Sequence, residues 1–138
     1  MTTAGERILI VEDNPANMKL LSFMLISRGY EVRTATDARE ALETLQGFAP
    51  RLMLVDVQLP GMDGLELTRC VKSDPRTRAI FVVAVTAYAM KGDEQKARDA
   101  GCDGYITKPI DTRRFPQLIA EYLSAAAASG GAAILTGR

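Results

Sequence analysis

Short apolar runs alternate along this chain with longer segments in which apolar residues recur at helical spacing. The short runs are rich in β-branched residues and end at turn signals, which predicts strands at residues 7–11, 31–35, 52–56, 80–86 and 104–107. Continuous apolar runs of this length are typical of strands buried on both faces. Because these strands alternate with helices, the chain is predicted to be an α/β protein, a doubly wound parallel sheet with five strands, five helices and right-handed crossovers.

The helical segments start at recognisable capping residues. Asn14 is expected to cap the first helix ahead of Pro15, while Asp37 and Asp63 should cap the second and third, each with a Glu three residues later. The last helix has the clearest amphipathic pattern, with apolar residues at 115, 118, 119, 122 and 123. On the third helix, Arg69 and Lys72 are expected to form a solvated face.

The fourth helical segment, at about residues 91–100, differs from the others. Its inward stripe consists of Ala97 and Ala100 only. Small apolar side chains bury little area, so this helix is expected to dock weakly. Two interpretations remain open, a short surface helix and an element that can shift.

Length and composition indicate one domain at 6–124, followed by a low-complexity tail or linker stub at 125–138. Seventeen basic and seventeen acidic residues give no net charge, which argues against a general electrostatic grip on nucleic acid or on an anionic membrane. The sequence shows neither a membrane-spanning run nor a signal peptide. Cys70 and Cys102 lack metal-binding spacing and are expected to be reduced structural thiols, so a cytoplasmic location is predicted.

Acidic residues follow two of the apolar runs. Glu12 and Asp13 come directly after the first predicted strand, and Asp56 ends the third. A solvated acidic turn would explain the first pair alone. However, parallel strands share their carboxyl edge, so the three carboxylates are expected to converge at the edge where open α/β sheets bind ligands. Carboxylates without His or Cys suit Mg²⁺, or Mn²⁺, and not zinc.

Two further strand ends carry functional groups. Thr86 ends the fourth predicted strand with a hydroxyl, and Lys108 follows the fifth as the only cation at a strand end. A metal, a hydroxyl and an ammonium group beside carboxylates form a phosphoryl-binding environment. Asp56 is the natural nucleophile because an Asp carboxylate can form an aspartyl phosphate.

Four stretches carry a resemblance to a known family. ILIVEDNP, LMLVDVQLPGMDG, VVAVTAYA and GYITKPI match, in order and spacing, the receiver domain of two-component response regulators, over about residues 7–123. Through VVAVTAYAMKGDE the chain looks most like the single-domain, DivK-type regulators of bacterial cell division. The resemblance implies a CheY-like, flavodoxin-like fold with strand order 2-1-3-4-5.

The resemblance also implies roles for the acidic residues. Asp56 resembles the phosphoacceptor that takes a phosphoryl group from a histidine kinase or phosphotransfer protein in a Mg²⁺-dependent reaction. Glu12 and Asp13 look like the acidic pair that binds the metal, with Asp56 and the backbone carbonyl of Gln58 as further ligands. Such a domain is not an enzyme in the usual sense, because it catalyses only its own phosphorylation and dephosphorylation.

The other implied roles concern switching. Thr86 resembles the hydroxyl that moves toward the phosphoryl group, Tyr105 the aromatic residue whose ring then turns inward, and Lys108 the lysine that pairs with a phosphoryl oxygen. The Lys108–Pro109 bond is cis in the family. The output would be a face formed by the fourth helix, fifth strand and fifth helix, read by a downstream protein. Tyr88 is bulky enough to predict slow attack of water on the aspartyl phosphate.

Three alternatives compete with a stand-alone receiver. The first is a phosphatase of the haloacid dehalogenase type, but Asp56-Val57-Gln58 lacks the second Asp of its D-x-D pattern. The second is a receiver fragment of a larger response regulator or hybrid kinase, which the tail at 125–138 permits. The third is an interaction module that is never phosphorylated.

Overall fold

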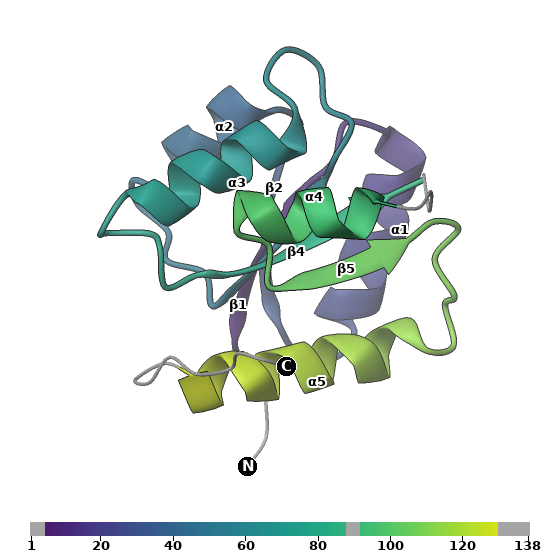
Figure 1. Cartoon of the computed structure of the whole chain (residues 1–138). Coiled ribbons are helices and arrows are strands. Elements are labelled where there is room, and N and C mark those ends of the chain that lie inside the picture. Colours follow the sequence, from purple (N-terminus) through teal and green to yellow (C-terminus); the bar gives the residue numbers. More distant parts are fainter. Residues whose placement is uncertain (1–4, 88–91, 130–138) are drawn as a thin grey trace.

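Five parallel strands form one sheet in the order β2-β1-β3-β4-β5, as the family resemblance implied. The computed structural model describes residues 5–87 and 92–129 (Figure 1). The strands are buried apolar runs, apart from the outer strands β2 and β5, which are partly exposed. Their bounds are β1 Arg7–Val11, β2 Glu31–Ala35, β3 Leu52–Asp56, β4 Phe81–Thr86 and β5 Gly104–Thr107.

Five helices alternate with these strands, and the predicted capping residues begin three of them. Asn14 accepts the N–H of Asn17, Asp37 accepts the N–H of Glu40, and Asp63 forms a full capping box with Glu66. The bounds are α1 Pro15–Ile26, α2 Ala38–Thr44, α3 Gly64–Ser73, α4 Asp93–Ala100 and α5 Phe115–Ser129. The last helix therefore continues into the segment 125–138, and Ala126 is buried.

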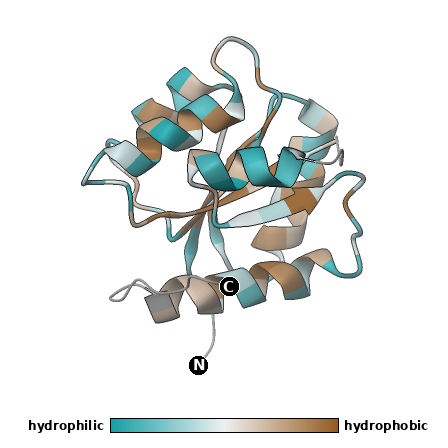
Figure 2. Cartoon of the chain, in the orientation of Figure 1, coloured by the Kyte–Doolittle hydropathy of each residue, from teal (hydrophilic) through white to brown (hydrophobic). Residues whose placement is uncertain are grey.

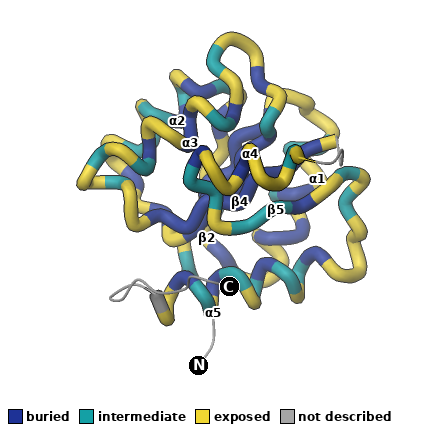
Figure 3. The backbone as a smooth tube through the Cα atoms, in the orientation of Figure 1, coloured by how far each residue is buried: buried dark blue, intermediate teal, exposed yellow. Residues whose placement is uncertain are grey.

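Two apolar clusters lie on opposite faces of the sheet. One joins β1, β3 and β4 to α1 and α5, with Leu25, Phe115 and Ile119 almost fully buried. The other joins alternate residues of the same strands to α2 and α3, with Leu67 and Val71 at its centre. Figure 3 shows buried central strands between helices in which buried and exposed residues alternate, and Figure 2 shows hydrophobic colour on the central strands and on much of α5. The sheet is thus covered on both sides, and its carboxyl edge is left for ligands.

Helix α4 belongs to neither cluster. Its buried residues are Ala97 and Ala100, as expected from the sequence, and its visible surface is mostly hydrophilic (Figure 2). Its N-cap, Gly92, has no side chain with which to cap the helix. Because its buried residues are two alanines, little apolar area holds α4 against the rest of the protein.

Lys72 does not lie on a solvated face of α3, so the sequence prediction for this residue is wrong. Its ammonium group donates to the carbonyl oxygens of Arg78 (3.1 Å) and Ile80 (2.7 Å) and to the carboxylate of Asp103 (2.8 Å). Only 22% of the Lys72 side chain is exposed. Three acceptors from two loops therefore surround a side chain that the local sequence pattern placed in solvent.

Candidate functional site

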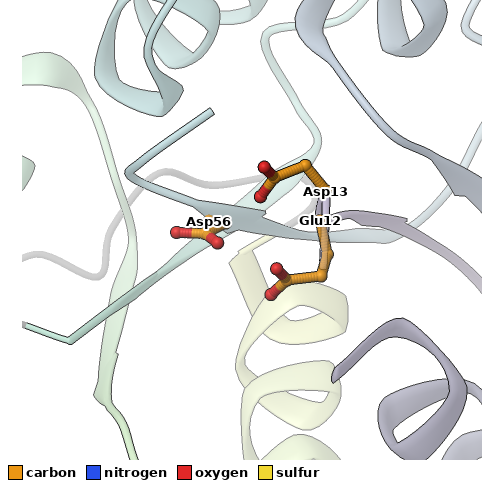
Figure 4. Close-up of side chains that lie close together, drawn as sticks. All are labelled: Glu12, Asp13 and Asp56. Atoms are coloured by element: carbon orange, nitrogen blue, oxygen red, sulfur yellow. The ribbon is translucent and has the colours of Figure 1, made fainter. Parts of the chain in front are cut away.

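The three predicted acidic residues meet at the carboxyl edge of the sheet. Val11 and Val55 are partners in the register of β1 and β3, so Glu12 and Asp13 lie beside Asp56. One carboxylate oxygen from each residue lies within 4.8 Å of the others. Figure 4 shows the three carboxylates gathered around a common space. Glu12 and Asp56 are buried, whereas Asp13 is exposed.

Lys108 provides a positive charge at this edge. The backbone N–H of Lys108 donates to the carbonyl of Thr86 (2.7 Å), which continues the pairing of β5 with β4 beyond Thr107. Its Nζ lies 3.0 Å from Oδ2 of Asp56 and 3.3 Å from Oε1 of Glu12. The Lys108–Pro109 peptide bond is cis, as the resemblance implied. A single ammonium group thus faces two buried carboxylates.

The pKa values at the site reflect this crowding. Burial raises the pKa of Glu12, and the nearby Asp56 raises it further, although the Asn14 N–H and Lys108 act in the opposite direction. Burial would lower the pKa of Lys108. The hydrogen bond and charge of Asp56, together with the charge of Glu12, outweigh burial, so the pKa lies above its usual value. Lys108 is therefore a cation at neutral pH.

The backbone around Asp56 is held closely by the start of α3. The N–H of Gln58 donates to Oδ1 of Asp56 (2.9 Å), and the N–H of Gly64 donates to the carbonyl of Val57 (2.9 Å). A Cβ atom at position 64 would lie 2.3 Å from the carbonyl oxygen of Asp56 and 2.8 Å from Cα of Val57. Only glycine allows this approach, which fixes the carboxylate-bearing turn against α3.

The residues fit a hard divalent cation. All three donors are carboxylates, which match the oxygen preference of Mg²⁺ and Mn²⁺. One oxygen, Oε1 of Glu12, is buried and accepts no well-aligned hydrogen bond within the described part of the chain, although the Nζ of Lys108 lies 3.3 Å from it. The lysine ammonium compensates the negative charge of this oxygen. A metal bound by Glu12, Asp13 and Asp56 would add a second cationic partner to the same carboxylates.

The two predicted switch residues lie on β4 and β5. Thr86 is buried at the end of β4, next to the strand that carries Asp56. Tyr105 is half-buried on β5 and lines a groove of about 250 Å³ between α4 and α5. Burial raises the pKa of the Tyr105 phenol, and the charges of Asp93 and Glu94 add to this. Tyr88 lies outside the described residues.

The sequence interpretation missed an exposed apolar stripe on α1. Leu20, Phe23 and Ile26 are the large apolar residues that are exposed in the described ranges, and Phe23 is 70% exposed. Leu20 also lines a groove of about 530 Å³ that includes Glu12, Lys108 and Ile110. A second apolar stripe beside Met18, Leu21 and Leu25 was visible in the sequence and could have indicated this surface.

Comparisons with known proteins agree with this architecture. A family model described as the response regulator receiver domain matches residues 8–120. The polar-differentiation response regulator DivK of Brucella anthropi is 47% identical over 116 residues, which cover 84% of this chain and 94% of that protein. DivK of Brucella melitensis matches at the same identity and over the same shares of both chains.

Solved structures give the same picture. A CheY-like receiver domain protein from Methanospirillum hungatei superposes with a TM-score of 0.83 at 32% identity, covering 91% of this chain and 99% of that one. The receiver domain of a sensor histidine kinase from Pseudomonas aeruginosa superposes with a TM-score of 0.79 at 31% identity. The match covers 88% of this chain and 99% of that one. That structure has a magnesium ion coordinated in its active site cleft.

Proposed function

Because this chain belongs to the response regulator receiver family and is similar to DivK, we propose that Asp56 accepts a phosphoryl group in a signalling relay. One observation carries the proposal: the Asp56 carboxylate lies within 4.8 Å of two other carboxylates and 3.0 Å from the Lys108 ammonium. Like charges held this close cost free energy, and such arrangements concentrate at functional sites.

The transfer follows from the chemistry of Asp56. One carboxylate oxygen attacks the phosphorus of a phosphohistidine, an O–P bond forms, and the P–N bond breaks. The imidazole nitrogen leaves with the electron pair of that bond. Lys108 offsets the negative charge of the transferring group, and Gln58 orients the carboxylate through its N–H. Thr86 then provides a hydroxyl for the phosphoryl oxygens.

Mg²⁺ or Mn²⁺ would be held by Glu12, Asp13 and Asp56, with the Gln58 carbonyl as a further ligand. When bound, the metal would neutralise charge on the phosphoryl oxygens. The support for this cation is the set of three carboxylates, each with an oxygen within 4.8 Å of the others, of which Glu12 and Asp56 are buried.

The experiment is phosphorylation with acetyl phosphate and Mg²⁺, followed by intact-mass spectrometry. Wild type should gain one phosphoryl group, and chelation of the metal should prevent it. Asp56→Asn should gain none, whereas Asp99→Asn, which alters an exposed residue of α4, should behave as wild type. Equal labelling of wild type and Asp56→Asn would reject the proposal, and so would steady turnover of small phosphomonoesters, which would indicate a phosphatase.

The proposed partners are a histidine kinase or phosphotransfer protein and a downstream protein. The exposed stripe of Leu20, Phe23 and Ile26, next to a groove lined by Lys108, supports docking of the phosphodonor beside Asp56. Among the described residues, no helix is both long and apolar enough to cross a membrane. We propose a stand-alone, DivK-type role in the cytoplasm, with regulation of a protein and not of nucleic acid.

A further inference from the structure

A groove of about 450 Å³ lies at the amino edge of the sheet, the edge opposite the carboxylates. It forms where β1, β3 and β4 begin, and residues 5–7, 49–51 and part of the loop before β4 line it. The five residues of β1 separate this edge from Glu12 by roughly 16 Å. The amino-edge groove is therefore distinct from the site at which Asp56 lies.

Three arginines line this groove. Arg7 begins β1, and Arg51 directly precedes β3 and donates its N–H to the carbonyl of Arg7 (2.9 Å). Neighbouring strands lie about 4.8 Å apart, so the two side chains leave the backbone at adjacent points. Arg76 adds a third guanidinium from the loop before β4, and its Nε and Nη2 donate to Asp74. Three segments of the chain thus bring cationic side chains to one space.

Arg7 and Arg51 keep most of their N–H donors available although each has a carboxylate nearby. Nε of Arg7 donates to Glu31 (3.3 Å), and Nε of Arg51 lies 3.5 Å from Oε1 of Glu6. Within the described part of the chain, the terminal amino groups of both arginines make no hydrogen bond. Both pairs are partly exposed, and such pairs contribute little to stability. An anion can therefore bind the free ends of the two guanidinium groups at little cost.

Capping of helix C-termini would be a purely structural role for these arginines, because α2 and α3 end near this edge. Other groups already fill that role. The hydroxyls of Ser73 and Thr77 donate to carbonyls of the last turn of α3, and the N–H groups of Gln46 and Gly47 donate to those of α2. In the described ranges, the side chains of the three arginines donate to carboxylates and to no carbonyl.

Beside the arginines, the groove has an apolar part. Ala49, Pro50, Ala79 and Ile80 contribute to its lining, and Pro50 and Ile80 are buried. A space of this volume is typical of sites for small molecules, and a phosphate ion alone would fill only part of it. Guanidinium groups next to an apolar surface suit a molecule that has a phosphate at one end and a less polar remainder.

We propose that the amino-edge groove binds a small organic molecule that carries a phosphate group. The terminal amino groups of Arg7 and Arg51 donate to the phosphate oxygens in the two-pronged geometry that guanidinium groups favour, and Arg76 adds positive charge. Arg51 is the principal contact, because within the described chain its side chain makes no hydrogen bond that the phosphate must displace. Binding makes and breaks no covalent bond, and it does not depend on phosphorylation of Asp56.

Titration of the full chain followed by amide NMR, in chelator, tests the site with three probes: inorganic phosphate, ribose phosphate and guanosine monophosphate. Saturable shifts are expected at the amides of Gly5, Arg51 and Ile80, which lie in the groove, and not at those of Gln58 and Lys108. At least one organic probe should bind about fivefold or more tightly than inorganic phosphate, because only the organic probes reach the apolar part. Which of the two binds more tightly distinguishes a sugar phosphate from a nucleotide as the ligand.

Variants identify the groups that bind the probe. Arg51→Gln should weaken binding of the tighter organic probe about tenfold or more, and Arg51→Lys should weaken it several-fold, because lysine keeps the charge but lacks the fork. Arg7→Gln should act like Arg51→Gln, which provides a second test if one variant does not fold. Arg69→Gln alters an exposed arginine of α3 outside the groove and should bind like wild type, and so should Asp56→Asn.

Several results would overturn the inference. One is the absence of saturable shifts at the groove amides with all three probes, and another is shifts of equal size at Gln58 and Lys108. Equal affinity for inorganic phosphate and both organic probes would contradict the organic remainder. Equal weakening by Arg51→Gln and Arg69→Gln would leave only a general effect of charge. Tighter binding of a tetraglutamate peptide than of any phosphate would instead indicate an acidic protein partner.

Discussion

Replacing Lys108 by methionine should leave two buried carboxylates without their cation. At an effective dielectric constant of about 20, charges 3.0 and 3.3 Å apart attract by roughly 5 kcal/mol each. Lys108 itself loses hydration in the folded protein, so the net effect is smaller. Removing one partner of a buried ion pair typically costs about 3–5 kcal/mol, and we expect a loss in this range for Lys108→Met at neutral pH without metal.

The loss should depend on pH. The raised pKa of Glu12 means that the folded protein binds its proton more tightly than the unfolded chain does. Stability therefore falls as pH rises from the unfolded pKa of Glu12 through its folded value, and in Lys108→Met this fall should be steeper and extend to higher pH. Acidification should accordingly reduce the difference in unfolding free energy between Lys108→Met and wild type. The contribution of Lys108 to wild type is fully present at neutral pH, because its raised pKa keeps it charged.

Urea unfolding followed by circular dichroism, in chelator and across the pH range, measures this difference. Lys19→Met, which alters an exposed lysine of α1, is the matched control and should change stability by less than about 0.5 kcal/mol. Saturating Mg²⁺ should restore much of the stability of Lys108→Met, because a divalent cation replaces the missing positive charge. If Lys108→Met lowers the unfolding free energy by less than about 1 kcal/mol, and by the same amount at every pH, Lys108 does not compensate the negative charge of the two carboxylates.

Three other changes have defined outcomes. Glu12→Gln should stabilise the metal-free protein by about 1 kcal/mol at neutral pH and flatten the pH dependence of its stability, as measured by urea unfolding. The same variant should weaken Mg²⁺ binding about tenfold or more, as measured by calorimetry, and an unchanged Mg²⁺ affinity would remove Glu12 from the metal site. Gly64→Ala should cost about 3 kcal/mol in unfolding free energy, because its Cβ would overlap the carbonyl of Asp56, whereas Gly47→Ala, in open space, should cost much less. Phe23→Ser should slow phosphorylation by a cognate kinase about tenfold but not phosphorylation by acetyl phosphate, and equal slowing of both would argue against a docking role.

The sheet and the acidic site could be predicted because the relevant signals are local. Apolar runs such as Leu52–Val55 can be buried only as interior strands, and turn residues fix where each strand ends. Once the strands are parallel, their carboxyl ends share one edge, so Glu12, Asp13, Asp56 and Lys108 had to be neighbours. The carboxylates come from the adjacent strands β1 and β3, whereas Lys108 follows β5, two strands from β3, and reaches Asp56 through its long side chain.

The errors concern side chains whose partners are distant in sequence. Lys72 has the pattern of a solvated residue, but its ammonium binds carbonyls of a following loop and a carboxylate 31 positions later. No local periodicity specifies such choices, because they depend on how loops pack in three dimensions.

The outer strand β2 limits the ways in which this chain can self-associate. Its exposed residues include Glu31, which pairs with Arg7 (3.3 Å), and Arg33, whose guanidinium lies 4.8 Å from the centre of the Phe48 ring. Charged side chains along a sheet border discourage a second chain from adding its own backbone there. Fibril-like growth through this border is therefore disfavoured, and recruitment of other proteins is left to the helical surfaces.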